Sequence, residues 1–562
     1  MNKSLVLTIV LVAAFGGGFL AYRTVQSSNV PEGPLPGEPV GATLLEGLGD
    51  YSMPVTTGSP EAQRWFNQGL MLTYGFNHDA AERSFLKATE LDPECAMCWW
   101  GAALVLGPHV NSGMEPANNQ KAWDRVQRAQ SLAAKASERE RNYITALTAR
   151  YAQNPPEDRL PLDEAYAKAM ATLVKQHPDD LDAATLYAES LMNLQPWDYW
   201  DAEGKPKENI EEVVTVLESV MARNPDHAGT LHLYVHAVEA SNEPQRGVDA
   251  ADRLRELIPG SGHLVHMPAH IYARVGRYHD AVIANQKAIA ADDAYLAMCR
   301  PQPGVYPLGY VPHNHHFLWF AATMEGASSI ALEAAKATSD RTSDPQLMRT
   351  PGFEAMQAFA LTPLFAKVRF GKWDEVANTP RPADDLPYMV AMWHYAQGIA
   401  ATRQGKLDEA KAHHQAVVAG STDPTIEKML VFSRYSLVHS VRIAERVLAA
   451  ELARSQKDYA TAIAALKEAV ALEDGIPYDE PPGWHAPVRQ TLGAVLLQSG
   501  KPAEAQAVFT EELRRNPENG WSLYGLEQSL KALGRKQEAK EVGERFTRAW
   551  SNADIKLNVA TL

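Results

Sequence analysis

The feature that most constrains the fold is a pattern of small and large residues near the start of the chain. Gly69 and Ala81 are small, Trp65 and Phe85 are large, and Pro93 follows them. Small residues let two helices approach closely, large ones fill the space between helix pairs, and proline ends the second helix. The pattern therefore predicts a pair of packed helices that stacks on similar pairs.

These residues resemble the tetratricopeptide-repeat (TPR) consensus, whose unit has about 34 residues. All six consensus positions match in a unit that begins at Ala62: Trp65, Gly69, Ala81, Phe85, Ala88 and Pro93. Partial units begin at Ala391, with Gly398 and Ala410, and at Ala486, with Gly493, Ala505, Phe509 and Pro517; a further unit carries Ala539. The resemblance implies an all-α, right-handed superhelical solenoid of helical hairpins.

The resemblance covers most of residues 61–550 and weakens over 120–225 and 295–385, where prolines mark insertions. We expect five parts. They are an N-terminal membrane anchor or signal segment (1–23), a flexible Pro/Gly linker (24–60), an N-terminal TPR array (61–295), an irregular helical insert with a His-rich loop (296–385) and a C-terminal TPR array (386–550).

The N-terminus predicts export. An uncharged stretch from Leu5 to Tyr22 lies between Lys3 and Arg23, which is short for a membrane span and long for a signal-peptide core. An uncleaved anchor helix is favoured over a cleaved signal because no good small-residue cleavage site follows. An uncleaved anchor places the body outside the inner membrane, in the periplasm of a Gram-negative source. A cleaved signal leads to secretion.

Composition excludes some classes of function. The net charge of -15 argues against general binding to nucleic acid. Three cysteines are too few for a disulfide scaffold, so helix packing must supply the core. The sequence carries no nucleotide-binding loop and no familiar hydrolase signature.

Histidine is concentrated in one window. Nine of the 18 histidines lie between His232 and His316, where uniform scatter would place roughly three. His232, His236 and Glu239 follow a spacing that puts them on one stripe of a helix. The TPR register places His266 and His270 at the positions of His232 and His236 in the next unit, and the resemblance implies that these residues share one patch of the concave groove with His263.

Imidazole and carboxylate groups at this spacing are ligands for Zn, Cu or Fe ions. The candidate metal ligands are His232, His236, Glu239, His263, His266, His270, His313 and His316. The alternative is a polar groove whose histidines bond to carbonyls or carboxylates. Pro268 starts a helix near Met267 and so moves His266 toward a cap. The loop from Arg300 to Pro312 is a candidate lid over the groove, and His279 is expected to be exposed.

Cys95 and Cys98 form a C-x-x-C motif at the start of a predicted helix. In an oxidising compartment a local disulfide is favoured over a metal or redox site and over two inert thiols. The motif does not attach haem, because Trp99 stands where histidine is needed. Cys299 is left over.

Two weaker candidates lie in the C-terminal half. Trp484, in the turn from Glu480 to His485, lines a ligand pocket or, as the favoured alternative, packs on the next helix. His394 stands where TPR units usually carry tryptophan, which favours a satisfied core histidine over a groove residue.

Three functions remain open from the sequence. The first is a metal-binding protein with a His/Glu-rich groove, the second an adaptor that binds a protein or peptide in the groove without metal. The third is a metal-dependent oxidoreductase or hydrolase in which Glu239 acts as the base. The groove offers His and Glu rather than the Asn, Lys and Arg of a peptide clamp, which favours metal binding.

Overall fold

The first predicted hairpin is present as α2 (Pro60–Tyr74) and α3 (His78–Leu91). The computed structural model describes residues 41–562 except 202–203 and 302. Phe85 of α3 is fully buried, and a methyl group added at Gly69 or at Gly101 would lie 2.8 or 2.4 Å from its ring. The small and large residues of the repeat therefore pack as the pattern predicts.

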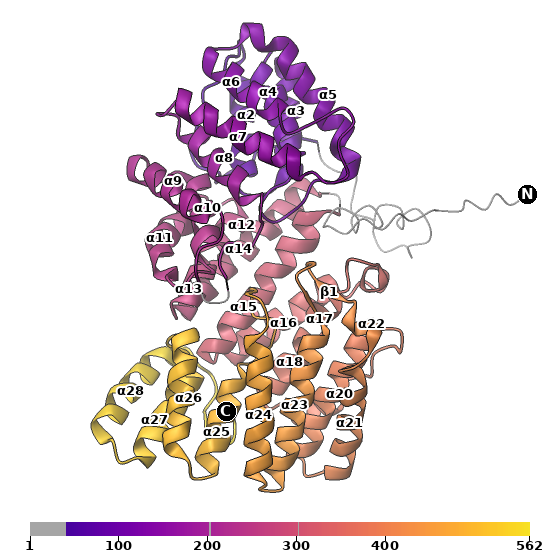
Figure 1. Cartoon of the computed structure of the whole chain (residues 1–562), viewed down its shortest axis with the longest axis vertical. Coiled ribbons are helices and arrows are strands. Elements are labelled where there is room, and N and C mark those ends of the chain that lie inside the picture. The colour runs from indigo at the N-terminus through magenta and orange to yellow at the C-terminus, as the bar shows by residue number, and fades with distance from the viewer. Residues whose placement is uncertain (1–40, 202–203, 302) are drawn as a thin grey trace, which may run out of the picture.

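Helical hairpins continue from this unit through the magenta part of Figure 1. The next helices of this N-terminal part are α4 (Ala96–Leu104), α5 (Asn119–Leu132), α6 (Glu138–Thr148), α7 (Leu160–Gln176), α8 (Leu181–Met192), α9 (Ile210–Arg223), α10 (Ala228–Val238), α11 (Val248–Leu257), α12 (Gly262–His266), α13 (Pro268–Arg274) and α14 (Tyr278–Cys299). Short 3₁₀ turns lie at η1 (Pro116–Asn118), η2 (Ala133–Lys135) and η3 (Pro244–Gly247).

The stretch with the weakest repeat pattern is helical too. A π-helical turn, η4 (Tyr306–Tyr310), leads into α15 (Val311–Glu325), which is followed by α16 (Ser328–Thr342), η5 (Leu347–Arg349), α17 (Met356–Ala360), α18 (Thr362–Arg369) and α19 (Trp373–Ala377). His313, His315 and His316 lie on α15 and not in a loop, which corrects the predicted His-rich loop. Pro312 is tolerated because it lies in the first turn of that helix.

The C-terminal array forms the orange and yellow part of Figure 1. Its helices are α20 (Pro387–Arg403), α21 (Leu407–Gly420), α22 (Pro424–Glu427), α23 (Val438–Ser455), α24 (Tyr459–Asp474), α25 (Val488–Gln498), α26 (Pro502–Arg515), α27 (Gly520–Ala532) and α28 (Lys536–Ala549). The strands β1 (Leu430–Val431) and β2 (Tyr435–Ser436) pair antiparallel, with Leu430 opposite Ser436. The prediction of an all-α architecture is confirmed.

The C-terminal hairpins fold back against the middle of the chain. Trp521 Nε1 in α27 donates to the carbonyl of Thr323 in α15 at 2.8 Å. Gly276, before α14, lies so close to Pro517 that an added methyl group would be 2.5 Å from the Pro517 oxygen. Because the chain folds back in this way, the turn from Glu480 to His485, which precedes α25, lies against the helices that carry the histidines.

The described part of the predicted linker is packed. Residues 41–59 form no helix, but Met53 is 1% exposed. The nitrogen of Leu45 donates to Gln68 Oε1 at 2.8 Å, and the nitrogen of Gly260 donates to the Gly47 oxygen at 2.8 Å. The prediction of a flexible linker is thus wrong for this part. Its apolar side chains pack against the repeats, and its backbone groups make hydrogen bonds with them.

The predicted anchor, residues 1–23, and the rest of the linker up to residue 40 lie outside the described residues. Among the helices of residues 41–562 that the structure describes, none is both long and apolar enough to cross a membrane.

Candidate metal centre

Six of the predicted histidine ligands come together from four helices. His232 and His236 lie on α10, His263 and His266 on α12, His270 on α13 and His313 on α15. Helix α13 begins at Pro268, close to the start predicted near Met267. His266 is the last residue of α12, a short helix that was not predicted. Five of the six side chains are buried, with at most 2% exposed, and His313 is partly buried.

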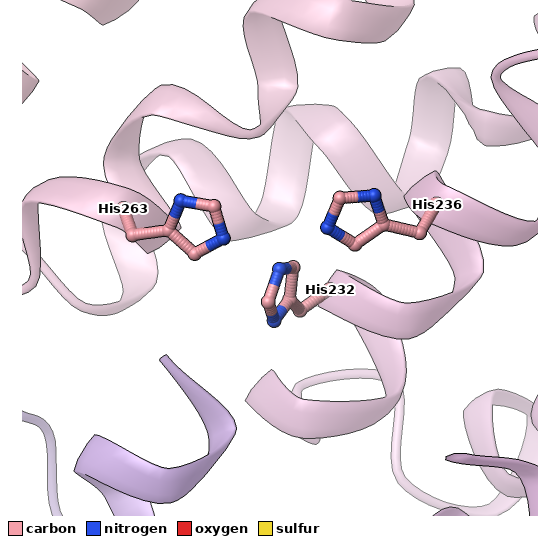
Figure 2. Close-up of side chains that lie close together, drawn as sticks. All are labelled: His232, His236 and His263. Atoms are coloured by element: carbon pink, nitrogen blue, oxygen red, sulfur yellow. The ribbon is translucent and has the colours of Figure 1, made fainter. Parts of the chain in front are cut away.

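The first three histidines form a set that we name site A: His232, His236 and His263. Their rings point toward one another in Figure 2. One side-chain nitrogen from each lies within 4.8 Å of the other two. The ring of His232 is 4.9 Å from that of His236 and 4.8 Å from that of His263, centroid to centroid.

Hydrogen bonds fix which nitrogens of site A carry protons. His232 Nδ1 donates to the main-chain oxygen of Tyr74 at 2.6 Å, and His236 Nδ1 donates to Glu239 Oε1 at 3.0 Å. The Nε2 atoms of both rings are buried and have no hydrogen-bond partner, and in the neutral form of each ring they are lone pairs. Both ring nitrogens of His263 lack one as well. Buried polar atoms are seldom left unpaired, so this set calls for a ligand.

The second set, site B, consists of His266, His270 and His313. The Nε2 atoms of His266 and His270 are 2.7 Å apart. His266 Nδ1 lies 2.7 Å from Asn285 Oδ1 and must donate to it, because the amide nitrogen of Asn285 donates to Ala281. The ring of His313 is 4.7 Å from that of His266 and 5.7 Å from that of His270.

Two carboxylates flank His270. Its Nδ1 lies 2.7 Å from Glu239 Oε2 and also contacts Glu480 Oε2. Burial disfavours both charges, but the mutual attraction outweighs it, lowering the pKa of Glu239 below its usual range and raising that of His270 above its usual range. One oxygen of Glu239 accepts from His236 and the other pairs with His270.

Four of the other imidazoles are held neutral. Burial, with help from neighbouring histidines, places the pKa values of His232, His263, His266 and His313 well below the ordinary value. Neutral imidazole is the form that binds transition metals.

The patch is buried rather than open to a groove. Phe76 stacks on His236 and His263 with centroid distances of 5.9 and 5.6 Å. Tyr310 of η4 covers His263 at 4.3 Å, so the loop before α15 does fold over the histidines. The predicted patch is therefore present, but its surroundings differ from a solvent-lined concave surface.

Three residues of this region, His78, His109 and Glu480, are not predicted by the sequence pattern. His109 stacks on Phe76 at 4.5 Å and lies beside His78, 4.4 Å away between centroids. Glu480 was noted only as the start of a turn. His78 and His109 lie outside the His-rich window, and no local spacing in the sequence connects Glu480 to His270.

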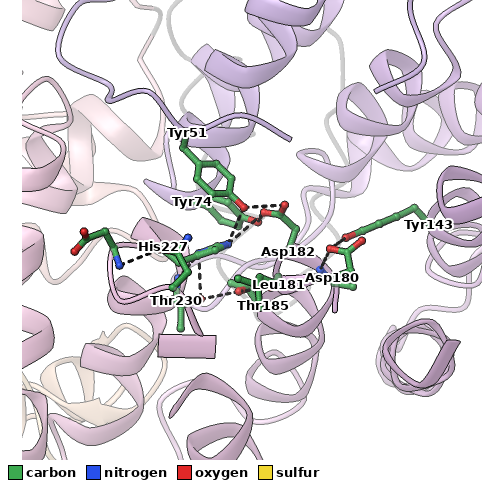
Figure 3. A network of polar contacts seen from close by, with 12 residues as sticks. Tyr51, Tyr74, Tyr143, Asp180, Leu181, Asp182, Thr185, His227 and Thr230 are labelled. Atoms are coloured by element: carbon green, nitrogen blue, oxygen red, sulfur yellow. Dashed lines mark hydrogen bonds and ion pairs between the residues drawn. The ribbon is translucent and has the colours of Figure 1, made fainter. Parts of the chain in front are cut away.

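A polar network supports α10 from the other side (Figure 3). Asp182 accepts hydrogen bonds from the hydroxyls of Tyr51 and Tyr74 at 2.9 and 2.6 Å. His227, the residue before α10, lies 3.3 Å from the same carboxylate and accepts from the nitrogen of Thr230. The network ties residues 41–59, α2, α8 and α10 together.

The other predicted site residues lie elsewhere. His316 stacks on Trp319 at 5.1 Å and belongs to neither site A nor site B. His279 is 54% exposed at its side chain, as expected. Cys95 and Cys98 form a disulfide, and Cys299 is a buried free thiol.

The two weaker candidates are structural in their contacts. Trp484 is 5% exposed and packs 5.5 Å from Tyr395, beside a small cavity of about 40 Å³. His394 is partly buried, with its Nδ1 2.8 Å from His413 Nδ1. Burial and the neighbouring His413 lower the pKa of His394 to about 4.

Comparison with known proteins supports the repeat architecture. Residues 62–95 match the family described as Tetratricopeptide repeat. The chain therefore carries a tetratricopeptide repeat in its first hairpin. Its TPR match coincides with α2, α3 and the following turn, where Phe85 packs against Gly69 and Gly101.

Solved structures share the arrangement of this chain only loosely. The APC/C hetero-tetramer Cut9–Hcn1 has 15% identity and a TM-score of 0.30, covering 84% of this chain and 76% of that chain. The human IFIT1 dimer with m7Gppp-AAAA has 14% identity and a TM-score of 0.30, covering 88% and 91%. Such low TM-scores carry no functional argument. No curated protein matches the chain.

Proposed function

We propose that this protein is an interaction scaffold whose C-terminal array binds extended peptide segments. The TPR architecture supports a protein partner. The observation that carries the proposal is that the array already holds a non-helical segment of its own chain, residues 551–562, which we name the tail segment; residues 553–558 precede a turn at 559–561.

The tail segment is held by its main chain. Arg403, at the end of α20, donates to the oxygen of Ala560 at 2.9 Å. Arg454, near the end of α23, donates to the oxygens of Val559 and Ala560 at 3.4 and 3.5 Å. Glu451 orients both guanidinium groups through ion pairs of 2.9 Å. Contacts to backbone oxygens do not depend on side-chain identity, so they suit a general peptide clamp.

The side chains of the tail segment alternate. Ala553, Ile555, Leu557 and Val559 are partly buried, whereas the residues between them are exposed. This period of two is the mark of an extended peptide on a surface. A cavity of about 420 Å³ lined by Arg403, Glu451, Arg454 and Ala560 continues beside it. We therefore propose a partner with apolar residues at every second position.

The test uses a chain that ends at Ser551 and a fluorescent peptide of residues 552–562. Fluorescence anisotropy should show binding to the shortened chain and at least tenfold weaker binding when Arg403 and Arg454 are both alanine. Arg253→Ala, a half-exposed arginine on α11, is the control. A folded shortened chain that does not bind the peptide would contradict the proposal.

Metal binding is a second candidate function. It is favoured by the buried nitrogens of His232, His236 and His263 that have no hydrogen-bond partner. Imidazole sets of this kind suit Zn, Cu or Fe ions. Elemental analysis of the full chain should find such a metal, and a His236→Ala/His270→Ala variant of unchanged helicity should lose it. A parent chain that holds no metal, even after reconstitution, would contradict this candidate.

We also propose that the body functions in an oxidising compartment outside the inner membrane. The disulfide between Cys95 and Cys98 supports this location. Cell fractionation followed by thiol labelling without reductant tests it. A body found in the cytosol with both thiols free would contradict the proposal.

A further inference from the structure

We propose that the histidine cluster holds two metal ions, one on the three imidazoles of site A and one on those of site B, with Glu239 joining the two sites. The inference rests on the proposed metal-binding function and adds the number of ions, the division of the ligands and the role of the carboxylate.

Site A has the geometry of a three-histidine site. Each Nδ1 of His232 and His236 donates to an oxygen acceptor, so in the neutral form of these rings Nε2 is the free lone pair. A metal-bound histidine typically donates its second nitrogen to a carbonyl or a carboxylate in this way. Without a cation, these buried nitrogens have no hydrogen-bond partner among the described residues and lie beside one another and His263.

Site B repeats this arrangement around His266 and His270. Asn285 fixes the proton of His266 on Nδ1, and Nδ1 of His270 faces the carboxylates of Glu239 and Glu480. The Nε2 atoms of the two rings then meet at 2.7 Å, so a cation must lie between or beside them. A proton on Nε2 of His270 would make a hydrogen bond to Nε2 of His266, but it would not involve His313. A metal ion would bind all three rings.

Glu239 belongs to both sites without being needed as a ligand. Its Oε1 accepts from His236 of site A at 3.0 Å, and its Oε2 lies 2.7 Å from Nδ1 of His270 of site B. These are hydrogen-bond and ion-pair distances, whereas two ligands of one ion at 2.0–2.2 Å from it usually stand farther apart. A single carboxylate thus orients one imidazole in each site, and the rings of His236 and His270 are 6.1 Å apart.

The ligand set selects the class of ion. Three imidazole nitrogens with no thiolate and no carboxylate among the ligands suit Zn²⁺ or Cu²⁺, and in site B the ion would displace the proton of His270. Three protein ligands leave a fourth position open, as in catalytic rather than structural zinc sites. Two such open positions next to each other would let one small molecule bridge both ions.

The experiment counts ions on the full chain. After chelator treatment, the protein is equilibrated with Zn²⁺ in the presence of a weak competing chelator, and bound zinc is measured. We expect two equivalents in the parent, one in His263→Ala and one in His313→Ala. Glu239→Gln should keep both sites but weaken each about 10–100-fold. His279→Ala, on the exposed face of α14, should keep two at full affinity.

The outcomes separate this inference from the proposed function. One equivalent in the parent, or a single variant that loses both ions, would overturn the two-site assignment and leave metal binding intact. Two ions in His313→Ala together with one ion in Glu480→Gln would also overturn the two-site assignment. The second ion would then be held by Glu239, His270 and Glu480. No zinc in the parent would overturn both. If His263→Ala loses its helical circular dichroism, His232→Gln replaces it.

Discussion

The main-chain oxygen of Tyr74 accepts a hydrogen bond from Nδ1 of His232 at 2.6 Å, across 158 residues of sequence. The hydroxyl of the same tyrosine donates to Asp182 at 2.6 Å. One residue at the end of α2 therefore connects the buried network around Asp182 to site A. The orientation of His232 depends on how the first hairpin packs against α10.

Removing the shared acceptor should destabilise this junction. In Asp182→Ala the hydroxyls of Tyr51 and Tyr74 lose their buried partner, and we expect the free energy of unfolding to fall by about 3 kcal/mol. Urea denaturation followed by circular dichroism measures the change. Asp179→Ala, whose side chain is fully exposed, is the control and should stay within about 0.5 kcal/mol of the parent. Equal effects of both variants would contradict the role given to Asp182.

The close helix contact at Gly69 should not tolerate a methyl group. The added carbon of Gly69→Ala would lie 2.8 Å from the buried Phe85 ring, so the first hairpin must open. We expect a loss of about 1–3 kcal/mol. Gly58→Ala has nothing within 4 Å of the new carbon and serves as the control in the same thermal melt. A Gly69→Ala protein that melts with the parent would show that the hairpin is not packed this tightly.

Because of Asp292, the free energy of unfolding should fall as the pH rises. Burial raises the pKa of Asp292 to about 7, although Tyr306 and Asn314 donate to it. Its unfolded pKa is near 3.9. Between about pH 4 and 7 the folded chain therefore holds a proton that the unfolded chain lacks, and the slope reaches at most about 1.4 kcal/mol per pH unit.

Urea midpoints measured from pH 4 to 8 test this expectation. Asp292→Asn cannot ionise, so its stability should fall less steeply over that range than that of the parent. Asp340→Asn, an exposed residue on α16, should keep the parent slope. Parallel curves for the parent and Asp292→Asn would mean that Asp292 ionises normally in the folded protein.

Asp554 should hold the tail segment in place. Its carboxylate accepts from the nitrogens of Ser328 and Ser329 at 2.7 and 2.9 Å, at the start of α16. In Asp554→Ala we expect trypsin to cut after the exposed Lys556 several times faster, because cleavage requires a released segment. Mass spectrometry follows the cut, with Asp384→Ala as the exposed control. An unchanged cleavage rate would show that the arginines hold the segment without Asp554.

Much of the local structure was predictable from sequence. Gly69 and Phe85, and likewise Gly493 and Phe509, mark helix contacts between near neighbours, and both pairs pack in this way. The break at Pro268 was also expected, since proline affects the backbone of its own helix. The segment from residue 41 to 59 was not, because its contacts are with distant repeats.

The sequence by itself determined the helical repeats and the stripes on which His232, His236 and His270 lie, since both follow from spacing within one helix. Only the tertiary structure decided that these residues are buried, that Tyr74 fixes the tautomer of His232 and that Glu480 meets His270. Those contacts depend on how successive hairpins accumulate their small rotations and bring the C-terminal array back to α13. That curvature is a sum over many packing contacts, and no single stretch of sequence encodes it.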